Sequence, residues 1–174
     1  MVIKLSNILS VPNKSEEMDA DITLTSIDGR GSAYEITSKE PVHVKLTNLG
    51  GQKIHLEAHI VCSVAIPCDR CLKDVIHDYD IEVDRKLNVS ESEDNDDLDD
   101  VNYIKEYNLD IDMLVYEEVT LRLPTKNLCW EDCKGICPVC GAVLNHKECG
   151  CDRKVYDPRM SDVLDIFNNY FKEV

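Results

Sequence analysis

The sequence predicts an α+β protein: mainly an antiparallel β-sheet, partly closed in the manner of a barrel, with a few helices and an appended cysteine-rich module. Apolar and polar residues alternate in several runs of the first half of the chain, which is the period of strands with one buried face. Six of the nine cysteines crowd into a short later segment. We therefore divide the chain into a β-rich domain (1–123), a cysteine-rich module (124–156) and a C-terminal amphipathic helix (157–174) that packs on the domain.

The alternation of apolar and polar residues locates the first strands, and glycines locate the turns between them. Alternating runs predict strands over 18–27, 42–46 and 54–60. Turns are predicted at Gly29 and Gly31, and the paired glycines of Asn48-Leu-Gly-Gly51 predict a hairpin loop.

A long hairpin is predicted next. The strand from Gln52 runs on to Ile66, turns through Pro67-Cys-Asp-Arg-Cys71 and returns over 74–87, so that a cysteine pair lies at the hairpin tip. Cys62 lies within an apolar run, and we expect it to be a buried small hydrophobic residue. The alternation of apolar and polar residues places three histidines on the polar faces of strands: His43, His55 and His59. We therefore do not assign them to a functional site.

The remaining segments predict one loop and two helices. Seven of the eleven residues in 90–100 are acidic, which indicates a solvated loop rather than core or a calcium site. A helix with Asp110 as its N-cap is predicted next, because four apolar residues lie at helical spacing: Ile111, Leu114, Val115 and Val119. The end of this segment also fits a strand. Asp157-Pro158 begins the C-terminal helix, whose apolar stripe we expect to dock on the sheet.

Composition excludes several classes of protein. The 174 residues carry 19 basic and 34 acidic side chains, and this net charge of −15 disfavours broad binding to nucleic acid or anionic membranes. No apolar run is long enough to span a membrane, and the first residues do not resemble a secretory signal. We therefore expect a cytoplasmic protein without a membrane partner. Basic proteins, or a small local contact with nucleic acid, remain as partners.

The cysteine spacing predicts two metal sites. In a reducing cytosol, paired cysteines indicate metal binding or redox chemistry rather than disulfides. Eight cysteines form four close pairs, in chain order Cys68 with Cys71, Cys129 with Cys133, Cys137 with Cys140, and Cys149 with Cys151. Each pair supplies half of a tetrahedral thiolate site, so we expect two zinc ions. Ligation by four cysteines leaves no open position, which predicts structural rather than catalytic zinc.

Chain reach favours one grouping of these pairs. The third and fourth pairs span fifteen residues, so one compact loop can bring them together at low entropic cost as site B. The first and second pairs then form site A. The alternative joins the second pair to the third and leaves the fourth to the distant first pair. A redox role for the first pair, or His146 as a ligand of site B, are further alternatives.

These residues together resemble a known family. Pro67-Cys-Asp-Arg-Cys-Leu72 is followed by Cys129-x3-Cys133-Lys-Gly-Ile-Cys137-Pro-Val-Cys140-Gly, by Cys149-Gly-Cys151 and by Asp157-Pro-Arg159. The combination is similar to that of the YceD family, bacterial and plastid proteins named for the accumulation of large-subunit ribosomal RNA. Val143 departs from the asparagine expected in the family's Gly-Ala-Asn-Leu-Asn sequence, but it lies between ligands and replaces none of them.

The resemblance implies a role in assembly of the large ribosomal subunit, through the processing or stability of its 23S RNA, without an established enzymatic activity. It also supports the grouping of the cysteines. Some members of the family keep the first pair and lack the last four ligands, which fits site A as part of the fold and site B as an addition.

Charge asymmetry suggests how such a role is divided along the chain. Residues 1–123 carry twelve basic and twenty-six acidic side chains, whereas 124–174 carry seven and eight. The basic residues that we assign to RNA or partner contact surround the cysteine-rich module: Lys126, Lys134, Lys147, Arg153, Lys154 and Arg159. We therefore expect an acidic adaptor for a basic ribosomal protein or assembly factor, with a local contact to ribosomal RNA through these residues.

The sequence lacks the motifs of other classes of function. A nuclease or hydrolase needs an open metal position or a positioned acid–base pair. The sequence contains no histidine–carboxylate motif and no phosphate-binding glycine loop, so we expect neither an enzyme nor a small-molecule substrate. A DNA-binding zinc ribbon is disfavoured by the acidity, and a thiol redox sensor is the remaining alternative.

Overall fold

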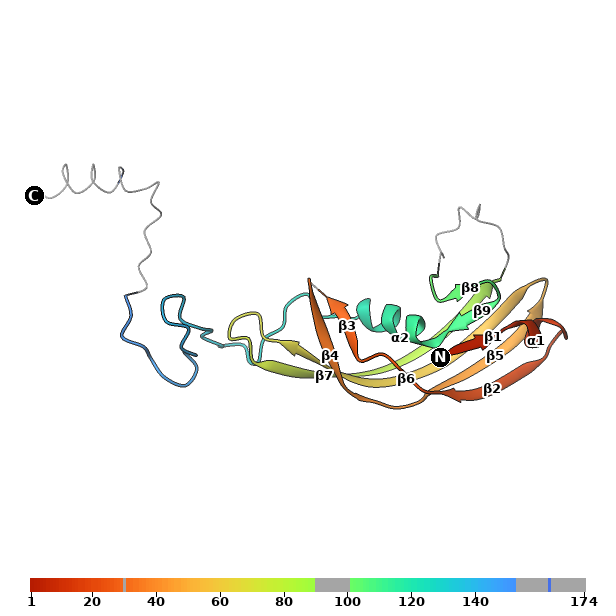
Figure 1. Cartoon of the computed structure of the whole chain (residues 1–174), viewed down its shortest axis with the longest axis horizontal. Coiled ribbons are helices and arrows are strands. Elements are labelled where there is room, and N and C mark those ends of the chain that lie inside the picture. The colour runs from red at the N-terminus through yellow and green to blue at the C-terminus, as the bar shows by residue number, and fades with distance from the viewer. Residues whose placement is uncertain (30, 90–100, 153–162, 164–174) are drawn as a thin grey trace, which may run out of the picture. The chain divides into compact units, whose positions relative to one another are not determined.

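A computed structural model describes residues 1–29, 31–89, 101–152 and 163 (Figure 1). The chain divides into two compact units, one formed by Met1–Cys68 with Lys73–Cys129 and the other by Asp69–Leu72 with Trp130–Val174. The predicted boundaries after residues 123 and 156 stay predictions. The predicted acidic loop at 90–100 and, apart from Val163, the predicted helix at 157–174 lie outside the described residues.

The first unit is built on a six-stranded antiparallel sheet. Its strands are β2 (Ser15–Ala20), β3 (Ser26–Gly29), β4 (Ser32–Lys39), β5 (Val42–Gly50), β6 (Lys53–Pro67) and β7 (Asp74–Asn88). β6 pairs with β7 over its whole length, from Lys53 opposite Asn88 to Pro67 opposite Asp74. The other edge of β6 pairs with β5 along one half and with β4 along the other, and β2 and β3 lie outside these two strands.

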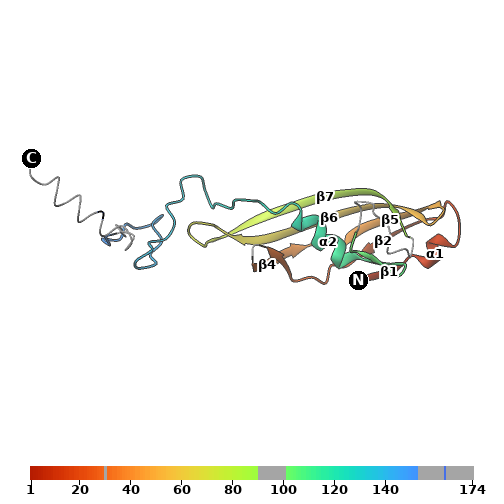
Figure 2. The same cartoon turned by 90° about the horizontal axis from the view of Figure 1, so that it is seen from above.

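The sheet is open, so the predicted barrel-like closure is wrong. Because β4 and β5 share one edge of β6, the sheet formed by the described residues is four strands wide: β2-β5-β6-β7 along one half and β3-β4-β6-β7 along the other. A closed barrel requires its outermost strands to pair, and the small barrels with filled interiors use five to eight strands or so. Four strands curve around the core instead of closing (Figures 1 and 2).

The core lies between the sheet and the elements on its inner face. Residues of two groups of elements complete this core. One is a small sheet of β1 (Val2–Lys4), β9 (Asn108–Asp110) and β8 (Ile104–Lys105), and the other is the pair of helices α1 (Ser6–Leu9) and α2 (Ile111–Thr120). Alternate residues of β6 are buried against them, and Cys62 is one of these, as predicted. Throughout the described ranges, none of the helices is both long and apolar enough to cross a membrane.

The predicted helix and its N-cap are confirmed in α2. The Asp110 carboxylate accepts hydrogen bonds from the N–H groups of Asp112 at 3.0 Å and Met113 at 3.4 Å, which satisfies donors of the first turn. The four apolar residues of the predicted stripe are buried. Sequence reasoning missed Glu118, which is 1% exposed and forms ion pairs with Arg85 of β7 at 2.6 Å and with Arg122 at 2.7 Å.

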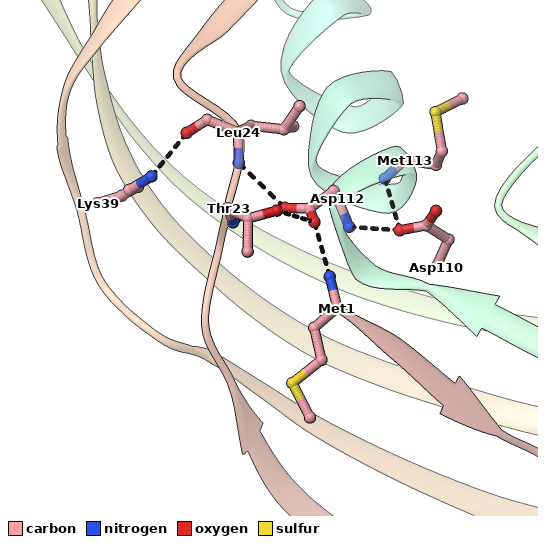
Figure 3. A network of polar contacts seen from close by, with 7 residues as sticks. All are labelled: Met1, Thr23, Leu24, Lys39, Asp110, Asp112 and Met113. Atoms are coloured by element: carbon pink, nitrogen blue, oxygen red, sulfur yellow. Dashed lines mark hydrogen bonds and ion pairs between the residues drawn. The ribbon is translucent and has the colours of Figure 1, made fainter.

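The predicted hairpins are also confirmed, but the predicted strand at 18–27 is divided. β2 ends at Ala20 and β3 begins at Ser26. Between them, the N–H groups of Thr23 and Leu24 donate to one oxygen of the Asp112 carboxylate, at 2.7 and 3.2 Å, instead of to a neighbouring strand (Figure 3). The Lys39 ammonium donates a hydrogen bond to the Leu24 carbonyl oxygen at 2.7 Å. A helix side chain therefore replaces strand pairing in this connection.

The Asp112 network generates a prediction about acid stability. Burial raises the pKa of this carboxyl, but hydrogen bonds from the Met1 amino group, Thr23 and Leu24 outweigh burial and lower the pKa from 3.8 to about 2. A lowered pKa stabilises the folded state above about pH 4, and this contribution is lost as the pH falls from about 4 to about 2. Since water partly screens the group, we expect a contribution of about 1 kcal/mol.

Urea unfolding of Asp112→Asn should therefore give a free energy of unfolding about 1 kcal/mol below that of the wild type at pH 7. The difference should shrink as the pH is lowered from about 4 to about 2. Asp21→Asn, a change of an exposed residue in the same connection, is the matched control and should have little effect at either pH. Equal losses in the two variants would contradict the role of the network.

Candidate metal centres

The tip of the β6–β7 hairpin positions the first cysteine pair. Cys68 follows β6 directly, and its N–H donates to the Lys73 carbonyl oxygen at 2.8 Å, which closes the turn. Leu72 has a φ of +61°, a left-handed conformation that lets the chain reverse direction after Cys71. The side chains of Cys68 and Cys71 are both buried.

Asn127 holds the segment after α2 against the end of β6. Its buried side-chain amide donates to the carbonyl oxygens of Ile66 at 2.7 Å and Pro67 at 3.1 Å, and its Oδ1 accepts a hydrogen bond from His77 Nε2 at 2.8 Å. Two residues later, the Cys129 N–H donates to the Cys68 sulfur at 3.4 Å. Asn127 thus brings Cys129 beside Cys68. Sequence reasoning missed this residue, because a loop asparagine carries no signal of its distant partners.

Arg70, inside the first cysteine pair, orders part of the second unit. Its guanidinium donates to the carbonyl oxygen of Cys133 at 2.8 Å, and its own carbonyl oxygen accepts from the Ile136 N–H at 3.1 Å. Gly135 has a φ of +77°, and a Cβ atom at this position would lie 2.9 Å from the Arg70 carbonyl oxygen. Only glycine therefore fits both the backbone conformation and the close approach.

The third cysteine pair lies in a tight turn of the second unit. The Cys137 N–H donates to the Ala142 carbonyl oxygen and the Gly141 N–H to that of Cys137, each at 2.8 Å. The backbone N–H groups of Cys140 and Val139 donate to the Cys137 sulfur and lower the pKa of its thiol to about 6. The turn therefore favours the thiolate, which is the form that binds a metal.

Asn145 connects this turn to the segment of Cys133. Its Oδ1 accepts from the Lys134 N–H at 2.7 Å, and its Nδ2 donates to the Cys133 sulfur at 3.2 Å. The neighbouring Leu144 N–H donates to the Gly135 carbonyl oxygen at 2.9 Å. Asn145 thus contacts a thiol from outside the ligand set, as outer-shell groups of metal sites do, whereas Asn127 positions the backbone next to Cys129.

The structure gathers eight thiols into two groups of four. In each group the sulfur atoms all lie within 4.8 Å of one another: Cys68, Cys71, Cys129 and Cys133 in site A, and Cys137, Cys140, Cys149 and Cys151 in site B. This is the grouping favoured by chain reach, and His146 belongs to neither group. A tetrahedral metal with metal–sulfur bonds of about 2.3 Å places its ligands about 3.8 Å apart. Both groups can therefore hold a metal ion.

The two groups differ in exposure. Three thiols of site A are buried, whereas in site B only Cys137 is buried and Cys140 is exposed. Hydrogen bonds with the Cys140 and Cys149 side chains, followed by burial, raise the pKa of the Cys151 thiol to about 12. Four thiolates at this spacing repel one another, and a divalent cation among them offsets the repulsion and favours their deprotonation.

The predicted RNA or partner contacts are only partly described. Lys126, Lys134 and Lys147 have exposed side chains, and the Lys134 ammonium lies 3.8 Å from the Glu148 carboxylate. Arg153, Lys154 and Arg159 lie outside the described residues. A common basic surface formed by the six residues stays a prediction.

The grouping generates a prediction about metal content. Cys68→Ser and Cys149→Ser should each reduce the zinc bound per chain from two ions to one in native mass spectrometry, because a serine hydroxyl is a poor ligand in a thiolate site. Cys62→Ala, which removes a thiol outside both groups, is the control and should keep two ions.

The same variants should differ in the fold. Cys68→Ser should perturb the amide NMR signals at the end of β6 and β7, whereas Cys149→Ser should leave the signals of the six-stranded sheet unchanged. Global unfolding of equal extent in both variants would contradict the assignment of these two cysteines to separate sites.

Asn127→Ala tests the positioning of site A. The change removes the amide that donates to the buried Ile66 carbonyl oxygen and to the partly buried Pro67 carbonyl oxygen, so we expect the free energy of unfolding to fall by about 1–3 kcal/mol. Zinc affinity should weaken by about tenfold or more at site A and stay unchanged at site B in competition with a chromogenic chelator. Asn102→Ala, at an exposed position, is the control. Unchanged affinity at both sites would show that Asn127 does not position a ligand.

A family model covers the cysteine-containing region of this chain. The model of the family described as "Large ribosomal RNA subunit accumulation protein YceD" matches residues 56–167, which is more than half of the chain. YlbN, an uncharacterized protein of Bacillus subtilis (strain 168), is 28% identical over 130 residues, or 74% of each chain. No solved structure matches. Since the family match includes all eight clustered cysteines, we conclude that this chain belongs to the YceD family.

Proposed function

We propose that this protein is a non-enzymatic, zinc-binding factor that supports the accumulation or processing of 23S ribosomal RNA during assembly of the large ribosomal subunit in the cytoplasm. The family match carries this proposal, because the family is described by accumulation of the large ribosomal RNA subunit. The chemistry of the two cysteine sites and the charge of the chain support a binding role.

Zinc is the metal that fits both sites best. Four thiolates within 4.8 Å of one another match the tetrahedral all-cysteine ligation of structural zinc. All four positions of each ion would be filled by the protein, which leaves none for a substrate or a catalytic water. The ions would therefore stabilise the turns that carry the cysteines. Asn127 supports that role by holding the backbone next to Cys129, and Asn145 by donating to the Cys133 sulfur.

The charge of the chain favours a protein as the principal partner. The net charge is −15, and two Zn(Cys)4 centres of −2 each would take it to about −19. A surface of this sign repels the phosphates of RNA but attracts basic ribosomal proteins and assembly factors. The proposed role is that of an adaptor, in which the acidic sheet unit holds such a basic protein.

A direct RNA contact by the second unit is the second candidate. Trp130 is 53% exposed, and Lys134 and Lys147 of the same unit are also exposed. An exposed aromatic ring and exposed cations in one unit are groups that can stack on unpaired bases and contact phosphates. Such a contact would be local, since the rest of the chain is acidic.

A pull-down of the tagged full-length chain from growing cells tests the proposal. The sample is divided into RNase-treated and untreated halves, and both are analysed for protein and RNA. We expect large-subunit RNA precursors in the untreated half and a basic protein that survives RNase in both. Precursors without an RNase-resistant protein would favour direct RNA contact, and the absence of both would contradict the proposed function.

A Lys134→Glu/Lys147→Glu variant separates the two candidates. The adaptor role predicts that the variant retains the RNase-resistant protein, whereas direct RNA contact predicts a loss of precursor RNA. Glu131→Lys/Asp132→Lys, an opposite change at exposed positions in the same unit, is the matched control for altered charge.

A further inference from the structure

The outer edge of β7 carries backbone groups that pair with no strand among the described residues. All 15 residues of β7 pair with β6 on one side, and no strand in the described part of the chain pairs with the other side. Every second residue of such an edge directs its N–H and C=O away from the sheet, where another chain can pair with them. The two other outer strands are shorter, with six residues in β2 and four in β3.

The solvent-facing side chains of this strand are mostly acidic. The alternation of β7 exposes, together with Ile76, Lys86 and Asn88, five carboxylates on the outer face of the sheet: Asp74, Asp78, Asp80, Glu82 and Asp84. Asp80 and Asp84 bond to His59 and His55 of β6 at 2.7 Å, yet their side chains remain 78% and 76% exposed. Carboxylates at alternate positions are about 6.7 Å apart along a strand, which is the spacing of alternate side chains in a paired strand.

A groove of about 330 Å³ lies on the same face, beside this row. Its polar lining comes from three neighbouring strands: His43, Lys45, Glu57, His59, Glu82 and Asp84. Lys45 and Glu57 neutralise each other in an ion pair at 2.8 Å. Glu82 has no ion pair with any described residue, so the groove offers an unneutralised carboxylate next to that of Asp84. It therefore suits a long cationic side chain.

The charges decide between two kinds of occupant. A second copy of β7 paired with this edge would place carboxylates opposite carboxylates, which destabilises cross-strand pairs. A strand with lysine or arginine at alternate positions would place cations opposite them and one long side chain near the groove. The edge therefore disfavours a second copy of β7 and suits a basic strand.

We propose that the open edge of β7 binds an extended, basic segment of a partner protein as an added β-strand. Backbone hydrogen bonds supply the affinity, and the carboxylates select lysine or arginine at alternate positions. The inference rests on the proposed adaptor function and identifies the surface that performs it.

Synthetic peptides of alternating lysine and threonine test the proposal with the zinc-loaded, full-length chain. Two further peptides carry N-methyl groups on alternate residues, one on the lysines and one on the threonines. A paired strand uses the N–H groups of only one set, so we expect one methylated peptide to bind as the parent does and the other to lose binding in fluorescence anisotropy. Equal binding by the two methylated peptides would overturn strand addition.

Charge reversal locates the binding surface. Glu82→Lys/Asp84→Lys should raise the dissociation constant of the lysine–threonine peptide by about tenfold or more. The matched control Asp28→Lys/Glu35→Lys, at exposed positions of β3 and β4, should change this constant by about twofold. If both double substitutions weakened peptide binding equally, the assignment of the binding surface to β7 would be overturned.

The outcomes separate this inference from the proposed function. If the Glu82→Lys/Asp84→Lys chain still recovers the RNase-resistant basic protein from cells, the β7 surface is wrong and the adaptor role stands. If the peptides bind at β7 but cells yield no basic protein, strand addition is supported and the adaptor role fails.

Discussion

The uninterrupted pairing of β6 with β7 is the constraint on which the rest of the structure depends. One edge of β6 is filled by β7, so β4 and β5 must share the other edge, and the sheet stays four strands wide and open. The buried face of the two strands forms much of the core. The turn at their end carries Cys68 and Cys71, and their outer face carries the row of carboxylates.

The two cysteine groups are positioned in different ways. In site A, hydrogen bonds between residues about sixty positions apart bring Cys129 to Cys68, through the buried amide of Asn127. Site B is formed by turns within fifteen residues, where backbone N–H groups point at a sulfur and Gly141 adopts a positive φ. Site A therefore depends on the tertiary fold, whereas site B depends on local chain geometry, which agrees with the greater exposure of its thiols.

The proposed function assigns these features to binding rather than to a reaction. In that proposal, closed thiolate sites stabilise the fold, and the exposed carboxylates of β7 would bind a cationic partner. In the described part of the chain, the two cysteine groups are the only clusters found that could hold a metal ion. Membership of the YceD family, described by accumulation of the large ribosomal RNA subunit, connects these binding surfaces with ribosome assembly in the proposed function.

The sequence by itself determined the features that depend on local spacing: the long hairpin, the burial of Cys62, the Asp110 cap of α2 and the two cysteine groups. Each follows from the period of a strand, the first turn of a helix or the short reach of a loop. Only the tertiary structure decided where strand pairing stops. The run at 18–27 alternates throughout, but a carboxylate from Asp112, nearly ninety residues away, takes its backbone donors. The open sheet, the buried Glu118 and the anchoring role of Asn127 depend in the same way on partners that are distant in the chain, and local periodicity carries no information about such contacts.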